Sequence, residues 1–188
     1  MMQQLMVQLW NGWDMIYYLC TRLTYVNKGN NIFRVIVKPY QGEPLETEDG
    51  YWLRPGDYYV QIHLHNVLLA KELRRLPPSE FAWAVMLKSC IRSSLPDLAR
   101  FVNEHPRSDQ IKLVLGTTCL YRGATRLGFE IKDIAYPRYK LWKSIGIRII
   151  FLFCHPQGWK KFFRRKGPFI PKRVFMSKEK LKRYLESD

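Results

Sequence analysis

The sequence is poor in cysteine, and the few cysteines that it has are not spaced for metal binding or redox chemistry. Cys20, Cys90, Cys119 and Cys154 lie far apart among apolar or aromatic neighbours, and no two of them form a C-x-x-C pair. Zinc sites and redox-active thiols usually show such close spacing. The four side chains are therefore predicted to be buried free thiols, and no metal site or cofactor is expected.

Segments that would export the chain or divide it are also missing. Residues Met1 to Leu5 lack the basic start, apolar core and cleavage site of a secretory signal, so we expect a cytoplasmic protein. No Gly/Ser-rich or low-complexity linker interrupts the 188 residues, of which 47% are hydrophobic. That content is enough for a buried core, so we expect a single domain over residues 1–188.

Acidic residues are absent between Asp133 and Glu179. Residues 1–50 carry a net charge of −1 and residues 51–110 a net charge of +2. Residues 111–188 hold 19 basic and 5 acidic side chains, a net charge of +14. Because a field of one sign attracts phosphates, acidic lipids and acidic polymers, the basic C-terminal third predicts an anionic partner.

Two patterns in the first half predict strands and helices. Ile32 to Lys38 and Tyr58 to Asn66 alternate apolar and polar residues, as half-buried strands do, and Asp49-Gly50 and Arg54 to Asp57 have the composition of turns. Helical spacing predicts an opening helix over residues 5–23, a helix over residues 81–91 with Ser79 as N-cap, and a separate helix from about Ser94 that stops at His105-Pro106.

The second half predicts a short strand, helix and strand in succession. A strand over Ile111 to Leu115 meets a glycine turn, a helix over Leu120 to Leu127 ends at Gly128, and a strand returns at Phe129 to Ile131. Further helices are expected at residues 139–154 and from Ser177, where Met176 and Leu181 are spaced as a hydrophobic staple. Together these elements predict an α+β fold: a small, mostly antiparallel sheet with helices on one side.

Two histidines on one strand form the first candidate site. In a strand His63 and His65 lie on the same face, close enough to share a proton-transfer role or a metal ion. The other histidines, His105 and His155, are remote in sequence, so a complete zinc ligand set is not indicated. We interpret the pair as a hydrogen-bonded polar sheet face, with a catalytic role as the alternative.

A second candidate site follows the strand at residues 111–115. Thr117 and Thr118 precede the expected helix, and Arg122 and Arg126 share one side of it, an arrangement that would cradle an anion. The spacing matches neither a P-loop nor a dinucleotide-binding glycine motif. The alternative is a tight turn whose arginines pair with nearby carboxylates.

The third candidate site is a basic aromatic segment. Ile145 to Phe163 combines an apolar run, interrupted by Arg148, with aromatic residues, and the run is too short to span a bilayer. The anion-binding residues expected here are Lys160, Lys161, Arg164, Arg165 and Lys166. Such a segment suits an anionic membrane surface or the stacking of nucleic-acid bases, and the alternative is a buried helix followed by a solvated basic face.

Short blocks spread over nearly the whole chain are similar to a known family. The blocks are Asn31 to Val35, Asp49-Gly50, Leu53 to Asp57, His63 to Asn66, Gly116 to Thr118, Tyr121 to Phe129, His155 to Gly158, Met176-Ser177 and Arg183-Tyr184. They resemble the YkoP-like domain of Firmicutes. The resemblance implies a protein that occurs alone or after a polysaccharide deacetylase domain, and hence a role in cell-envelope glycan metabolism. Deacetylase activity is not implied, because the metal-binding H-x-x-x-H pair is missing.

Three functional hypotheses result. The first is an accessory module of envelope polysaccharide metabolism that binds an anionic partner, either the inner face of the cell membrane or an anionic glycan precursor, through the basic C-terminal third. The second is a small group-transfer enzyme with an anion site at Arg122 and Arg126 and a base at His63 or His65. The third is nucleic-acid binding, although no helix-turn-helix, zinc-finger or RRM signature is present.

Overall fold

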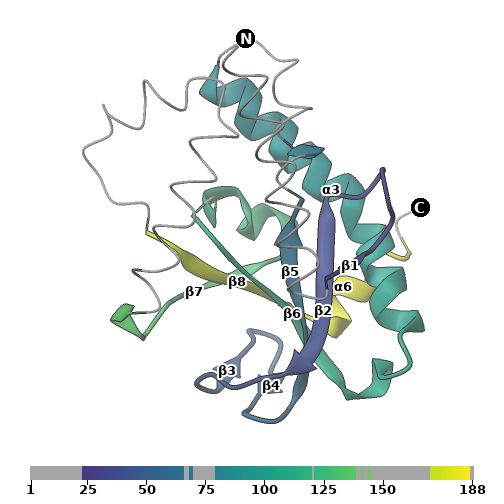
Figure 1. The fold of residues 1–188 in the computed structure, drawn as a ribbon, viewed down its shortest axis with the longest axis vertical. Coiled ribbons are helices and arrows are strands. Elements are labelled where there is room, and N and C mark those ends of the chain that lie inside the picture. The colour runs from purple at the N-terminus through teal and green to yellow at the C-terminus, as the bar shows by residue number, and fades with distance from the viewer. Residues whose placement is uncertain are drawn as a thin grey trace.

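The centre of the molecule is a six-stranded sheet (Figure 1). The computed structural model describes residues 23–65, 68–69, 79–119, 121–138, 141, 144 and 170–186. The sheet order is β1-β2-β5-β6-β8-β7, and its strands are β1 (Thr24–Tyr25), β2 (Phe33–Pro39), β5 (Tyr58–Leu64), β6 (Ile111–Thr118), β8 (Lys172–Ser177) and β7 (Glu130–Asp133). Only β5 and β6 pair in parallel. The predicted α+β class and mostly antiparallel sheet are confirmed.

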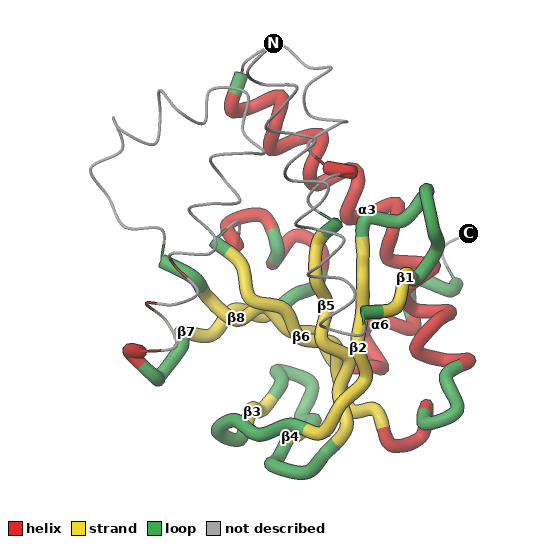
Figure 2. The backbone as a smooth tube through the Cα atoms, in the orientation of Figure 1, coloured by secondary structure: helices red, strands yellow, loops and turns green. Residues whose placement is uncertain are grey.

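One face of the sheet forms the main core beneath helix α3 (Glu80–Glu104). Val35, Val60 and Val114 lie on this face and are fully or almost fully buried. Leu95, Leu98 and Val102 supply the facing side of α3, at the spacing that places them on one side of a helix. Figure 2 shows α3 running beside the strands, and the short helix α6 (Lys178–Lys182) packs into the same core.

The prediction of two separate helices over residues 81–105 is wrong, because α3 continues through Pro96. Ser94, the expected start of the second helix, instead lies inside α3 and accepts a hydrogen bond at its hydroxyl from the Ile32 backbone N–H at 3.2 Å. Its carbonyl accepts another from Asn31 Nδ2 at 2.9 Å. Burial of the residues around Pro96 therefore holds the helix together where sequence signals alone favoured a break. The expected cap at Ser79 and stop at His105 are confirmed.

The opposite face of the sheet carries a smaller core under the hairpin β3 (Leu45–Glu46) and β4 (Trp52–Leu53). Leu45 and Leu53 are fully buried against Tyr59, Leu113 and Phe175 of the sheet. The predicted turns on either side of β4 are confirmed: Gly50 and Gly56 both have positive φ values, 83° and 95°. This hairpin covers one end of the sheet face opposite α3 (Figure 1).

The second half differs from its prediction at the glycine turn. Gly116 to Thr118 are not a turn but the last residues of β6, paired with β8. A Cβ at Gly116 would lie 2.9 Å from Ile62 Cγ1, so the glycine serves close strand packing. The expected helix is two short 3-10 turns, η2 (Tyr121–Gly123) and η3 (Thr125–Leu127), which end as predicted at Gly128 with φ 75°.

Strand β8, like the short strand β1, was missed by the sequence prediction. It lies between β6 and β7, so the two strands of the short strand–helix–strand unit are not neighbours. The hydrophobic staple that follows β8 is confirmed, since Ser177 caps α6 through the Lys180 N–H and both Met176 and Leu181 lie in the main core. In the helix expected at residues 139–154, only Leu141 and Ser144 are described, and both are helical; the opening helix lies outside the described residues.

The main core generates a stability prediction on α3. Leu98 is fully buried, so Leu98→Ala should lower the free energy of unfolding by about 2–5 kcal/mol, through lost burial and the cavity left behind. Val85 lies on the same helix with 52% of its surface exposed, and Val85→Ala should change stability by about 0.5 kcal/mol or less. Urea unfolding of both variants measures the difference, and equal losses would contradict the burial pattern.

Candidate functional site

Polar side chains line up across the sheet on the face opposite α3. Directly paired residues of neighbouring strands point to the same face, and the register pairs Arg34 with His63, Thr117 with Arg173, and Arg173 with Lys132. Because β5 and β6 are parallel and Gln61 pairs with Leu115, His63 and Thr117, each two residues further along, also lie opposite each other. We call Arg34, His63, Thr117, Arg173 and Lys132 the cross-strand row.

Arg173 is the best-defined residue of the row. Its Nη1 donates a hydrogen bond to Tyr40 Oη at 2.8 Å, and the guanidinium lies 6.0 Å from the centre of the Tyr40 ring. The side chain is half-buried. Among the described residues, no carboxylate lies within ion-pair distance of it. A hydroxyl from Thr117 and an ammonium from Lys132 come from the strands on either side.

Tyr40 does not neutralise Arg173. Burial raises the pKa of the Tyr40 phenol, and the opposing effect of the Arg173 charge and hydrogen bond does not cancel that rise. The phenol is therefore neutral at physiological pH. Buried charges are ordinarily paired with an opposite charge, so a half-buried guanidinium that faces a neutral phenol is a candidate contact for an external anion.

Of the two candidate histidines, His63 belongs to the other end of the row, and His65 follows Leu64, the last residue of β5. The ring of His65 makes an edge contact with Tyr25, with ring centres 5.5 Å apart. The guanidinium of Arg34 lies over the same Tyr25 ring at 4.8 Å, and Arg34 is 2% exposed. His63 is half-buried beside Arg34. The pair thus lies next to an aromatic ring and a guanidinium.

Metal binding has no support in the described residues. In that part of the chain, no group of three or more potential ligands could hold a metal ion.

Of the other candidate anion-binding residues, the structure describes the side chains of Thr118 and Arg126, and neither belongs to the cross-strand row. Thr118 pairs with Lys172 at the end of β6. Arg126 is exposed on η3, whose neighbours Leu127 and Phe129 pack into the core on the α3 face, so this turn and His63 lie on opposite sides of the sheet. The side chain of Arg122 and the basic segment Lys160, Lys161, Arg164, Arg165 and Lys166 lie outside the described residues.

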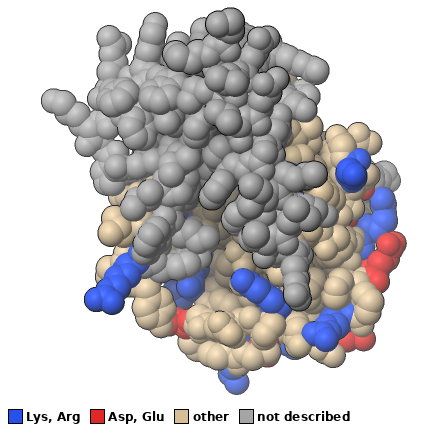
Figure 3. Space-filling model, in the orientation of Figure 1, with Lys and Arg blue, Asp and Glu red and all other residues tan. Residues whose placement is uncertain are grey.

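Several basic residues of the C-terminal third are neutralised locally. Lys172 pairs with Asp133 at 3.3 Å, and Lys182 pairs with Glu179 at 2.9 Å. Lys180 binds Glu130 at 2.8 Å and Glu48 at 3.3 Å. On the face seen in Figure 3, the visible Lys and Arg side chains form separate groups, several with Asp or Glu beside them. In the described part of the chain, the net charge alone therefore does not define an anion-binding surface.

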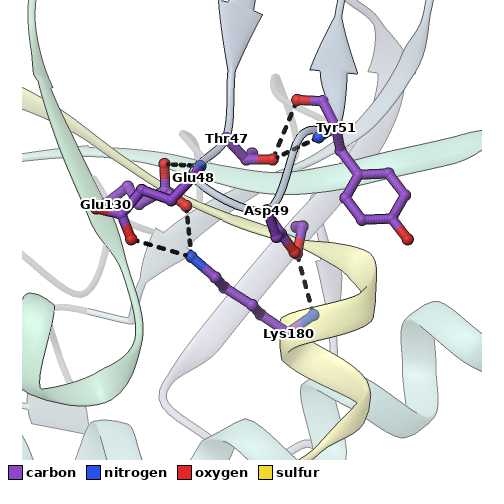
Figure 4. A network of polar contacts seen from close by, with 7 residues as sticks. Thr47, Glu48, Asp49, Tyr51, Glu130 and Lys180 are labelled. Carbon is purple, nitrogen blue, oxygen red and sulfur yellow. Dashed lines mark hydrogen bonds and ion pairs between the residues drawn. The ribbon is translucent and has the colours of Figure 1, made fainter.

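The Lys180 contacts join the β3–β4 hairpin to the C-terminal helix. In Figure 4 the Lys180 ammonium lies between the carboxylates of Glu48 and Glu130. Asp49, in the hairpin turn, accepts a hydrogen bond from Ser177 Oγ, which also accepts one from the Lys180 N–H. These bonds fix the hairpin over the face that carries Tyr40 and Arg173.

The comparisons with known proteins place the chain in a family. The family model described as the YkoP domain matches residues 3–185. The chain belongs to the YkoP family. It is 31% identical over 190 residues to an "Uncharacterized protein YkoP" of Bacillus subtilis (strain 168), with 100% of both chains covered. No solved structure matches. The resemblance to the YkoP family seen in the sequence is thus confirmed.

One further finding concerns membranes. Of the helices in the described part of this YkoP-family chain, none has both the length and the apolar character needed to cross a bilayer.

Sequence reasoning missed Arg34, Arg173, Lys132 and Tyr40. Strand β8 had a detectable signal, the apolar run Val174 to Met176 between basic residues. Its position between β6 and β7, which brings Arg173 opposite Thr117 and Lys132, had no local signal.

The Lys180 contacts predict that removing the Lys180 ammonium lowers the stability of the protein. The side chain of Glu130 is 9% exposed, so Lys180→Met leaves a largely buried carboxylate without its cation and should lower the free energy of unfolding by about 1–3 kcal/mol. The matched control is Lys182→Met, since the Lys182–Glu179 pair is well exposed and should contribute about 1 kcal/mol or less. If both variants unfold at the same urea concentration, Lys180 does not anchor the hairpin.

Asp49 predicts a pH dependence of stability. Burial by itself would raise the pKa of Asp49, but hydrogen bonds from Ser177 and Thr47 outweigh it and hold the pKa below 3.8. A lowered pKa in the folded state gives stability that is present above the unfolded pKa and lost as pH falls through the folded pKa. The difference in unfolding free energy between the native chain and Asp49→Asn should therefore shrink as pH falls below 3.8. A difference that stays constant down to the acid limit would show that the charge of Asp49 is not stabilising.

Proposed function

We propose that this YkoP-family chain is a non-catalytic accessory module that binds a phosphate- or carboxylate-bearing glycan precursor of the cell envelope through the cross-strand row. The observation that carries the proposal is Arg173, a half-buried guanidinium hydrogen-bonded to a neutral phenol. An oxyanion beside it would receive charge-assisted hydrogen bonds from Arg173 and the Thr117 hydroxyl, with the Lys132 ammonium one strand away.

The burial of the row favours a discrete ligand over a membrane surface. Arg34 is 2% exposed, His63, Thr117 and Arg173 are half-buried, and only Lys132, at the β7 end of the row, is exposed. Half-buried side chains can contact an anionic group only when that group enters between them. Adsorption to a flat anionic membrane depends instead on exposed basic side chains, each of which adds about 1 kcal/mol near the surface. The basic aromatic segment at residues 160–166 would serve the membrane alternative.

Two further features support an envelope ligand. The excess of basic over acidic residues after residue 110 would draw anions toward the protein before they reach the row. The resemblance to domains that follow polysaccharide deacetylases indicates a glycan as the molecule that carries the anion. The group-transfer alternative gains no support from the described residues, because His63 and the η3 turn with Arg126 lie on opposite sides of the sheet.

Calorimetric titration with glucose 1-phosphate, a simple sugar phosphate, tests the proposal. Arg173→Gln removes the charge but keeps donors for Tyr40, and it should weaken binding about 10- to 150-fold, because hydrogen bonds to charged groups contribute about 1.5–3 kcal/mol. The control is Lys112→Gln, which removes one exposed positive charge from β6 and should leave the affinity unchanged within about twofold.

The same two variants separate the alternatives. Co-sedimentation with phosphatidylglycerol vesicles but not phosphatidylcholine vesicles, unaffected by Arg173→Gln, would favour the membrane surface. Tight binding of a DNA oligonucleotide that falls steeply with salt would favour nucleic acid. Equal affinity of the native chain and Arg173→Gln for the sugar phosphate would remove the proposed site.

A further inference from the structure

We infer that Tyr40 is a positioning residue that holds the Arg173 guanidinium in the orientation needed to bind the anion, an inference that rests on the proposed function. Arginine is a long and flexible side chain, and its affinity for an oxyanion depends on how much rotational freedom is lost on binding. The 2.8 Å bond from Arg173 Nη1 to Tyr40 Oη removes part of that freedom beforehand. The remaining N–H groups of the guanidinium are enough for a bidentate contact with a phosphate or carboxylate.

The phenol of Tyr40 is itself fixed on several sides. Its hydroxyl donates a hydrogen bond to the Glu43 carbonyl at 2.7 Å, which leaves an oxygen lone pair for Arg173. Its ring makes an edge contact with Tyr59, with ring centres 5.5 Å apart. Tyr40 is 4% exposed. The direction of the hydroxyl is therefore determined by the protein and not by solvent.

The backbone around Tyr40 holds the residue in place. The Tyr40 N–H donates to the Asp57 carbonyl at 2.8 Å, and the Tyr40 carbonyl accepts from the Gly56 N–H at 2.9 Å. A Cβ at Gly42 would lie 2.6 Å from Tyr40 Cζ, so only glycine lets the loop after β2 close over the ring. The Gly42 residue and the Glu43 carbonyl therefore both help to fix the position of the Tyr40 phenol.

A double-mutant cycle on glucose 1-phosphate affinity tests the inference. Tyr40→Phe removes the hydroxyl and should weaken binding about 2- to 10-fold in the native background, the effect of one neutral hydrogen bond. In the Arg173→Gln background the same change should have no further effect, because its only route to the ligand is gone. Tyr59→Phe is the matched control, since its hydroxyl lies in the same aromatic cluster and its hydrogen bond goes to Gln61 at 3.4 Å, not to Arg173. It should bind like the native chain.

A second variant, Gly42→Ala, tests the same Tyr40 hydroxyl by moving it instead of removing it. Gly42→Ala keeps the Tyr40 hydroxyl but displaces the ring, so it should weaken binding as Tyr40→Phe does, with no further loss when Arg173→Gln is present. Equal losses from Tyr40→Phe in both backgrounds, or a loss from Tyr59→Phe as large as that from Tyr40→Phe, would overturn the positioning role while leaving the proposed function standing. No loss from Arg173→Gln would overturn both.

Discussion

Successive side chains of a strand point to opposite faces of a sheet, and the organisation of this molecule depends on that constraint. The alternation buries Val35, Val60 and Val114 under α3, where the main core forms. On the other face it aligns polar residues from strands that are distant in sequence, so that Thr117, Arg173 and Lys132 become direct neighbours. The same face carries the small core that supports Tyr40. Stability and the candidate site are therefore two results of one pattern.

Two cations near this face show why local compensation matters more than net charge. Lys180 lies between two carboxylates, and the hydrogen bond that it donates to Glu130 raises its pKa, so its charge is used to hold the hairpin. Arg173 is also half-buried but faces a neutral phenol. A charge that is paired with an opposite charge in the protein stabilises the fold, whereas a charge that is hydrogen-bonded to a neutral group can still bind an external ligand.

Local sequence signals predicted much of the fold and little of the site. Alternation in Tyr58 to Leu64, the cap at Ser79, the helix start at Ser177 and the glycine at Gly128 depend on nearby residues, and each is confirmed. The continuation of α3 through Pro96 depends on Asn31 and Ile32, some sixty residues away, and was not predictable. Arg173 meets Thr117 only because β8 inserts beside β6. The histidine pair was found because its two members are two residues apart, His63 on β5 and His65 directly after its last residue.

The central claim is that Arg173 meets an external anion, and side-chain NMR of its guanidinium tests this most directly. With the Nε–Hε signal of Arg173 assigned by comparison with Arg173→Gln, glucose 1-phosphate is added in steps. The account predicts a saturating shift of that signal, as expected for a charge-assisted contact. An unchanged Arg173 signal, while signals from other basic residues move, would contradict it.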